Sequence, residues 1–214
     1  MVKEAARLAE GARIIGLGSG STAAKIVKEL AGLKDEKMEF VPTSIQIKLE
    51  AEKNNLTIAD ENRIPDIDIV FDGADQIDEA FNMIKGGGGA LLREKILISS
   101  AKRVVILADE SKFVKQFSWP VPVEVHPMAR SSASRKLIAA GGKPSLRTLD
   151  KGYPFITENG NLILDTSFDS IKDPRAKEME LRSIPGVMEV GLFTRKADFY
   201  FKARNDGTFQ KITT

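Results

Sequence analysis

The chain has 214 residues, 42% of them hydrophobic and 29% charged, which is typical of a globular protein with one large domain or two small ones. Its 32 basic and 30 acidic residues leave a net charge of +2, so no basic surface for nucleic acid is expected. The absence of cysteine and the single histidine, His126, exclude disulfides, thiolate zinc sites and multi-histidine metal sites.

The first 120 residues alternate between strand and helix patterns. Short apolar runs are typical of buried strands, and apolar residues three and four positions apart indicate helices. Strands are predicted at 13–18, 39–44, 66–71 and 103–108, and helices at 22–33, 45–54 and 90–101. This alternation predicts a parallel sheet with right-handed crossover connections.

The pattern changes after residue 120. Strands are predicted at 120–125, 145–149 and 187–193, helices at 131–140 and 174–183, and a hairpin turn at 158–161 within an extended segment, 155–165. This β-α-β-β-α-β order is that of a ferredoxin-like fold. The tail, 198–214, contains a hairpin turn at 205–207 and is expected to return to the first sheet. We therefore expect one domain from 1–120 plus 198–214, and a second from 121–197.

No apolar run is long enough to span a bilayer, and the chain does not open with a secretory leader. We expect a cytoplasmic protein that binds neither membranes nor nucleic acid. With no thiolate or multi-histidine site available, its chemistry is expected to use carboxylates, amines, guanidinium groups, hydroxyls and the backbone.

Four chemically distinctive loops follow predicted strands of the first domain, and ligands of open parallel sheets bind where the strands end. In the first loop, 16–22, glycines, Ser21 and Thr22 precede a helix, and the backbone N–H groups of a helix N-terminus favour an anion. The spacing G-x-G-x-G-S differs from the dinucleotide motif, and the loop lacks the lysine of a P-loop. A single phosphate is the expected ligand. A tight turn with a serine or threonine cap is the structural alternative.

Two other loops carry charged side chains. Asp72 and Asp75 lie three residues apart after a strand, and two carboxylates held close together suit proton transfer because one pKa is raised. Aspartates are also common in turns for purely structural reasons. Lys112, after the fourth strand, suits a phosphate, although an exposed surface lysine explains it equally well.

The most specific segment is IKGGGGALLREK, residues 84–95. Glycine loses the most backbone freedom on folding, so four in a row indicate that the backbone approaches a ligand closely. The loop feeds a helix that places Glu94 near the positive helix end. A solvated Lys85 and a Glu94 that complements the helix dipole are the simpler explanations of those two residues, but neither explains the glycines.

The segments GLGSGSTAAK, PTS, FDGADQID, IKGGGGALLREK, ADESK, ITENGNLILD, IPGV and MEVGLF occur in this order along nearly the whole chain. Together they resemble the type A ribose-5-phosphate isomerases, and the DGAD and KGGGGA motifs are the most specific. The resemblance implies a Rossmann-like catalytic domain and a smaller ferredoxin-like α+β lid domain. It also implies interconversion of ribose 5-phosphate and ribulose 5-phosphate in the pentose phosphate pathway, without metal or cofactor, by a homodimer or homotetramer.

The resemblance assigns roles to individual residues. The expected catalytic residues are Glu94 as the base, Asp72, Asp75 and Lys85. The expected substrate-binding residues are Gly20, Ser21, Thr22, Gly86, Gly87, Gly88 and Lys112. Two positions depart from the family pattern. Gln76 stands where a glutamate is usual, and the amino-terminal helix is short, so that Lys3 matches a phosphate-contacting lysine only if the register shifts.

Two alternatives fit part of the pattern: a related sugar-phosphate enzyme or acyl-coenzyme A transferase on a similar sheet, and a non-catalytic sugar-phosphate sensor. A deaminase of amino sugars would place a histidine in its active site, and His126 lies outside the four loops. A coenzyme A transferase would need different contacts around its glutamate. A non-catalytic sugar-phosphate sensor would carry a DNA-binding helix-turn-helix, for which the sequence leaves no room. Such a sensor would also have no need of the four expected catalytic residues together.

Overall fold

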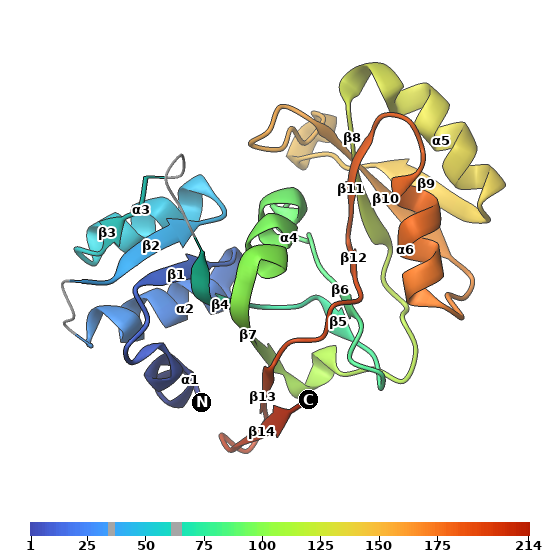
Figure 1. The fold of residues 1–214 in the computed structure, drawn as a ribbon. Coiled ribbons are helices and arrows are strands. Elements are labelled where there is room, and N and C mark those ends of the chain that lie inside the picture. Colours follow the sequence, from blue (N-terminus) through green and yellow to red (C-terminus); the bar gives the residue numbers. More distant parts are fainter. Residues whose placement is uncertain (34–36, 61–65) are drawn as a thin grey trace. The chain divides into compact units, whose positions relative to one another are not determined.

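The computed structural model describes residues 1–33, 37–60 and 66–214, and the chain divides into two compact units (Figure 1). Unit 1 comprises Met1–Ala74, Arg93–Lys112 and Ala197–Thr214, and unit 2 comprises Asp75–Leu92 and Phe113–Lys196. The sequence-based division assigns 75–92 and 113–120 to the first domain, whereas unit 2 includes them. The division into domains therefore stays a prediction. None of the described helices has the length and apolar character needed to cross a membrane.

Unit 1 is built on a seven-stranded sheet in the order β14-β13-β7-β4-β1-β2-β3. All neighbouring strands are parallel except β13 and β14. The strands are β1 (Ile14–Leu17), β2 (Glu39–Pro42), β3 (Thr57–Ile58), β4 (Ile67–Asp72), β7 (Ala101–Asp109), β13 (Phe199–Ala203) and β14 (Phe209–Thr213). The predicted parallel sheet is confirmed, and the tail returns to it as expected. The short strand β3 was not predicted.

Helices cover both faces of this sheet. They are α1 (Val2–Ala6), α2 (Gly20–Ala31), α3 (Ile45–Lys53) and α4 (Leu91–Ser100). Apolar residues of α1, α2 and α3 share a buried core with Ile15 and Leu17 of β1. A Cβ added to Gly16, between them, would lie 3.2 Å from Leu97 Cδ1 of α4. Because successive strand residues point to opposite faces, α4 covers the face opposite to α1–α3, which is the layering of a Rossmann-like fold.

The carboxylate of Asp68 connects three neighbouring strands of this sheet. Its Oδ2 accepts hydrogen bonds from the backbone N–H groups of Arg13 at 2.9 Å and Ile14 at 3.1 Å, at the start of β1. Its Oδ1 accepts from Lys102 Nζ of β7 at 2.9 Å. The hydrogen bond from Lys102 and the backbone hydrogen bond from Arg13 lower the pKa of Asp68 from 3.8 to about 2.

We expect Asp68→Asn to lower the free energy of unfolding at pH 7 by about 1 to 2 kcal/mol. The pKa is lower in the folded chain than the ordinary 3.8, so the ionised carboxylate stabilises the fold at neutral pH. That contribution is lost as the pH falls from about 4 toward 2. Urea unfolding midpoints at several pH values measure it. Asp169→Asn is the matched control, since Asp169 pairs with Lys143 at 2.8 Å but is 86% exposed. A difference for Asp68→Asn that stays constant with pH would contradict this role.

Unit 2 contains a four-stranded antiparallel sheet in the order β11-β8-β10-β9. Its elements are β8 (Val121–Val125), α5 (Arg130–Ala139), β9 (Gly142–Leu146), β10 (Leu162–Phe168), α6 (Pro174–Arg182) and β11 (Val187–Val190). Valines of β8 form a common core with Leu137 of α5 and Leu181 of α6. The chain order and the strand order confirm the predicted ferredoxin-like arrangement.

A second, three-stranded sheet in unit 2 was not predicted. It consists of β12 (Leu192–Phe193), β6 (Met83–Ile84) and β5 (Gln76–Ile77), in that order. The strand predicted at 187–193 is therefore divided at Gly191 between β11 and β12. Gly191 donates from its N–H to the Pro122 carbonyl at 2.7 Å, and its own carbonyl accepts from Lys85 N at 2.9 Å. A side chain at Gly191 would overlap the Lys85 carbonyl, so only glycine fits here.

Strand β9 begins at Gly142, three residues before the predicted start. Gly141 has a φ of 83°, which ends α5 in the left-handed conformation that glycine favours. A Cβ on Gly142 would lie 2.5 Å from Thr166 Cγ2 of β10, so the pairing begins directly after the turn. The strand ends at Leu146, and Arg147 follows it. The predicted turn at 158–161 is confirmed by the hydrogen bond from Thr157 N to Asn161 O at 2.8 Å.

Candidate active site

The residues expected to act on a substrate are divided between the two units. Unit 1 contains Gly20, Ser21, Thr22, Asp72, Glu94 and Lys112, and unit 2 contains Asp75, Lys85, Gly86, Gly87 and Gly88. Each set has its own geometry.

Asp72 is the last residue of β4, which lies between β7 and β1 in the seven-stranded sheet. Gly18, directly after β1, donates from its N–H to the Phe71 carbonyl at 2.8 Å. A Cβ on Gly18 would overlap the carboxylate of Asp72, which is 1% exposed, so the glycine at this position is required by the aspartate. Asp72 Oδ1 also accepts from Gly73 N at 2.7 Å. The structure therefore holds this carboxylate in one place at the carboxyl edge of the sheet.

The first loop leads into α2 at the same edge. Ser19 adopts an extended conformation and Gly20 a φ of 88°, after which the helix begins. The Ser19 hydroxyl makes no capping hydrogen bond to α2 and instead shares one with Thr43 Oγ1 at 2.8 Å. Thr22 lies beside Gly73, since a Cβ on Gly73 would be 3.6 Å from Thr22 Cβ. The Ser19 side chain therefore does not cap α2, and phosphate binding at this helix start stays a prediction.

Glu94 and Lys112 lie on opposite ends of the α4–β7 connection. Glu94 is in the first turn of α4 and is 4% exposed. Because α4 leads directly into β7, its first turn lies on the side where the parallel strands end. Lys112 is the last residue of a short 3₁₀ helix, Glu110–Lys112, that follows β7, and it is half-buried. The structure thus brings the predicted unit 1 residues to one edge of the sheet.

In unit 2, Lys85 follows β6 and is 2% exposed. Its backbone N–H donates to the Gly191 carbonyl at 2.9 Å, and its Nζ lies 5.5 Å from the centre of the Phe193 ring. A cation over an aromatic face is attracted by the ring, so Phe193 holds the ammonium while the hydrogen bond to Gly191 holds the Lys85 backbone. A buried lysine with these contacts is not the solvated surface lysine of the simpler explanation.

The glycine loop is fixed largely by side chains of its own unit. Gly87 donates from its N–H to Asp75 Oδ2 at 2.8 Å, and a Cβ on Gly87 would lie 2.7 Å from Asp75 Oδ1. A Cβ on Gly89 would overlap the Phe155 ring, and Gly86 has a φ of 102°. Gly88 is exposed, and a Cβ there would meet nothing within 4 Å. Contacts or backbone conformation inside the unit therefore explain Gly86, Gly87 and Gly89, and close approach of a ligand at Gly88 stays a prediction.

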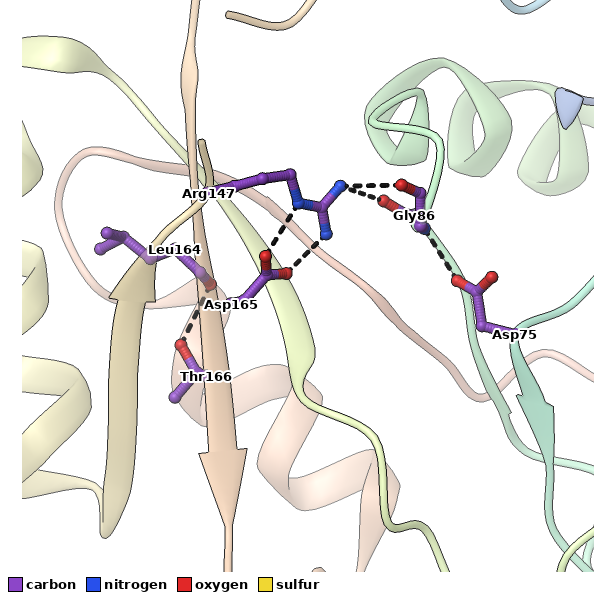
Figure 2. A network of polar contacts seen from close by, with 7 residues as sticks. Asp75, Gly86, Arg147, Leu164, Asp165 and Thr166 are labelled. Atoms are coloured by element: carbon purple, nitrogen blue, oxygen red, sulfur yellow. Dashed lines mark hydrogen bonds and ion pairs between the residues drawn. The ribbon is translucent and has the colours of Figure 1, made fainter. Parts of the chain in front are cut away.

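Arg147 was not predicted from the sequence. Its Nη1 donates to the carbonyls of Gly86 at 2.8 Å and Gly87 at 3.1 Å. Its Nε and Nη2 donate to Asp165 Oδ2 at 2.8 Å and Oδ1 at 2.5 Å (Figure 2). The only local signal is an arginine at a strand end, and no motif marks it, because its contacts with the loop are with residues about sixty positions earlier in the chain.

Gln76 and His126, which the sequence also singled out, make local hydrogen bonds. Gln76 donates to Ser118 Oγ at 2.8 Å and accepts from the N–H groups of Ser118 at 2.9 Å and Trp119 at 3.0 Å. Its side-chain amide therefore links β5 to residues 118–119. His126 is exposed and accepts from Met128 N at 3.3 Å. Within 1–33, 37–60 and 66–214, no group of three or more His, Cys, Asp or Glu side chains is arranged to hold a metal ion.

Comparison with known proteins gives consistent matches. The family model of ribose 5-phosphate isomerase A (phosphoriboisomerase A) matches residues 39–207. A ribose-5-phosphate isomerase A of Methanosarcina acetivorans is 43% identical over 98% of this chain and 91% of that protein, and one of Haloarcula marismortui is 42% identical over 96% and 90%.

Solved structures match the fold as closely. Ribose 5-phosphate isomerase A of Methanocaldococcus jannaschii has a TM-score of 0.92 and 38% identity, covering 100% of this chain and 96% of that one. A D-ribose-5-phosphate isomerase in complex with phospho-erythronic acid has a TM-score of 0.91 and 38% identity, covering 100% and 97%. The likeness therefore extends over both units.

Proposed function

Because the chain belongs to the ribose 5-phosphate isomerase A family, we propose that it interconverts D-ribose 5-phosphate and D-ribulose 5-phosphate through an enediolate, with Glu94 as the general base. The observation that carries this proposal is the full-length match to these isomerases. The relative solved with phospho-erythronic acid supports a sugar-phosphate substrate, since that ligand joins a phosphate to a short sugar acid. The burial of Asp72, Lys85 and Glu94, all 4% exposed or less, supports a catalytic rather than a surface role.

The reaction requires one proton to move between two neighbouring carbons. An aldose–ketose isomerase removes the proton from the carbon next to a carbonyl and returns it to the former carbonyl carbon. One carboxylate on one face of a planar enediolate can do both, and we assign this to Glu94. Asp72 and Asp75 would move protons between the substrate oxygens and assist opening of the furanose ring.

Negative charge develops on the substrate oxygens as the enediolate forms. Donors fixed in advance stabilise such charge, and this is usually the largest catalytic contribution. We assign this role to the Lys85 ammonium and to glycine-loop amides. Gly87 and Gly89 donate within unit 2, to Asp75 and to the Gly86 carbonyl, so Gly88 is the loop amide best suited to a substrate oxygen.

The substrate phosphate is assigned to Gly20, Ser21, Thr22 and Lys112. Binding energy from a group remote from the reacting carbons can orient those carbons for reaction. The start of α2 offers N–H groups and hydroxyls, and Lys112 offers a positive charge at the end of the neighbouring connection.

We expect Lys112→Ala to raise the KM for ribose 5-phosphate by about 10- to 100-fold and to change kcat much less, because a charge-assisted phosphate contact acts in the ground state and the transition state alike. Initial rates over a range of substrate concentrations measure both constants. Lys25→Ala is the control, since Lys25 is an exposed lysine of α2. An unchanged KM would remove Lys112 from the phosphate.

The proposed function is tested by following the purified protein with ribose 5-phosphate in ²H₂O by NMR. An enediolate pathway with a protein base yields ribulose 5-phosphate and exchanges solvent deuterium into the carbon-bound position that receives the proton. Deuterium in a fraction of the turnovers is sufficient, because a single base can return the proton that it removed before that proton exchanges; deuterium in none of them would favour a direct hydride shift over the enediolate. No conversion would overturn the isomerase itself.

The same family membership supports three further proposals. The enzyme acts in the pentose phosphate pathway of the cytoplasm, it assembles as a homodimer or homotetramer, and it needs no metal or cofactor. Light scattering after size-exclusion chromatography tests the assembly, and a monomeric mass at micromolar concentration would contradict it.

A further inference from the structure

The guanidinium of Arg147 holds two consecutive carbonyls of the glycine loop. We propose that Arg147 is a positioning residue for the isomerase reaction: it orients the peptide groups on either side of Gly87 so that one N–H meets Asp75 and the next, that of Gly88, faces the substrate. This role rests on the proposed function, because it concerns the donors that would stabilise the enediolate.

Arg147 is itself held rigidly. Its Nε and Nη2 form a two-pronged ion pair with Asp165, and only 15% of the Arg147 side chain and 26% of the Asp165 side chain are exposed. Asp165 lies within β10 and pairs with residues of both β8 and β9. The guanidinium also lies 5.8 Å from the centre of the Phe155 ring. Asp165 holds Nε and Nη2 of a planar group, so it also fixes the direction of the remaining nitrogen, Nη1.

The remaining nitrogen contacts two neighbouring peptide groups. Nη1 donates to the Gly86 carbonyl at 2.8 Å and to the Gly87 carbonyl at 3.1 Å. The Gly86 carbonyl shares a planar trans peptide with the N–H of Gly87, and the Gly87 carbonyl shares one with the N–H of Gly88. In a trans peptide the C=O and N–H bonds point in opposite directions. Both N–H bonds therefore point away from Arg147.

One of these two N–H groups has a known acceptor. The Gly87 N–H donates to Asp75 Oδ2 at 2.8 Å, and Figure 2 shows the loop backbone lying between Arg147 and Asp75. A peptide group that accepts from a cation at its oxygen is polarised and becomes a stronger donor at its nitrogen. Arg147 thus strengthens and aims the hydrogen bond that fixes Asp75.

The second N–H group belongs to Gly88, which is the open position of the loop. Gly88 is exposed, a Cβ there would meet nothing within 4 Å, and its N–H has no acceptor in the described part of the chain. Arg147 therefore fixes the direction of a Gly88 N–H that is available to a substrate oxygen. Charge developing on that oxygen would meet a donor whose peptide is already polarised by the guanidinium.

The test compares Arg147→Met, Arg147→Lys and Asp165→Asn with a matched control, Lys143→Met. Lys143 belongs to β9, the strand that leads into Arg147, and forms an exposed ion pair with Asp169 at 2.8 Å, but has no contact with the loop. We expect Arg147→Met to lower kcat for ribose 5-phosphate by about 10- to 100-fold with little change in KM, and Lys143→Met to leave both unchanged. Lysine cannot reproduce the fork, so Arg147→Lys is expected to rescue only part of the loss.

A second readout separates positioning from general support of the fold. Inhibition by phospho-erythronic acid is expected to weaken in the Arg147 and Asp165 variants by a factor similar to the loss in kcat, whereas inhibition by inorganic phosphate is expected to stay at the wild-type level. Thermal unfolding of the ligand-free variants identifies any that do not fold. If Arg147→Met does not fold, the conservative replacements Arg147→Lys and Asp165→Asn still test the proposal.

The outcomes distinguish the two proposals. An active wild-type enzyme whose folded Arg147 variants match Lys143→Met in kcat would overturn the positioning role and leave the isomerase intact. A parallel loss of inhibition by phospho-erythronic acid and by inorganic phosphate would overturn it as well, because it would indicate a loosened fold. A wild-type protein with no isomerase activity would overturn the proposed function and this role together.

Discussion

Glu94→Gln is expected to lower kcat for ribose 5-phosphate by about 10²- to 10⁴-fold, the range that general acid–base catalysis contributes. Glutamine keeps the shape of the side chain, which is 4% exposed in the first turn of α4, so folding and packing are preserved. Its amide cannot accept the proton from the sugar carbon. The substrate phosphate is assigned to other residues, so the KM is expected to change little.

Steady-state kinetics and thermal unfolding of Glu94→Gln measure this effect, with Glu52→Gln, an exposed glutamate of α3, as the control. Binding of phospho-erythronic acid to the inactive variant shows that its site is intact. Near-normal turnover would remove Glu94 as the base. A loss of both turnover and thermal stability would instead assign it a structural role.

Gly87→Ala is expected to lower kcat/KM by about 10²-fold or more, as a displacement of about 1 Å in a catalytic group does. The new Cβ would lie 2.7 Å from Asp75 Oδ1 and 3.1 Å from Oδ2, so the carboxylate would have to move away from the amide that now binds it. The loop around it is held by Arg147 and cannot easily yield.

Gly88→Ala serves as the comparison for stability, because a Cβ there would meet nothing within 4 Å. Thermal unfolding midpoints are expected to fall for Gly87→Ala and to stay at the wild-type value for Gly88→Ala. Equal loss of stability in both variants would mean that the loop tolerates no side chain at either position, and that the clash with Asp75 is not the cause. Normal kinetics for Gly87→Ala would show that the position of Asp75 is not critical.

Regular patterning made most of the fold predictable from sequence. The apolar runs that became β1, β4 and β7 and the amphipathic helix α2 bury enough side chains for their periodicity to be visible. The short strands β3, β5, β6 and β12 have two residues each and show no periodicity. They form because the backbone between longer elements finds hydrogen-bond partners, as at Gly191, and those partners are distant in sequence.

The candidate residues were predictable where a motif places them after a strand, as with Asp72 and Lys112. The packing that requires glycine at 87 and 89 was not predicted. Asp75 and Phe155 fill the space beside Gly87 and Gly89, and the spacing of a glycine run does not reveal which side chains pack against it. Arg147 was not predictable for the same reason, since a long side chain from another sheet reaches the loop without any local signal.

The most direct test is the rate at which the purified protein converts ribose 5-phosphate to ribulose 5-phosphate with EDTA present throughout. We expect robust turnover that EDTA does not reduce and that reaches the same equilibrium mixture from either sugar phosphate. Binding of ribose 5-phosphate without formation of ribulose 5-phosphate would contradict the proposed function and favour a sensor or a different sugar-phosphate reaction.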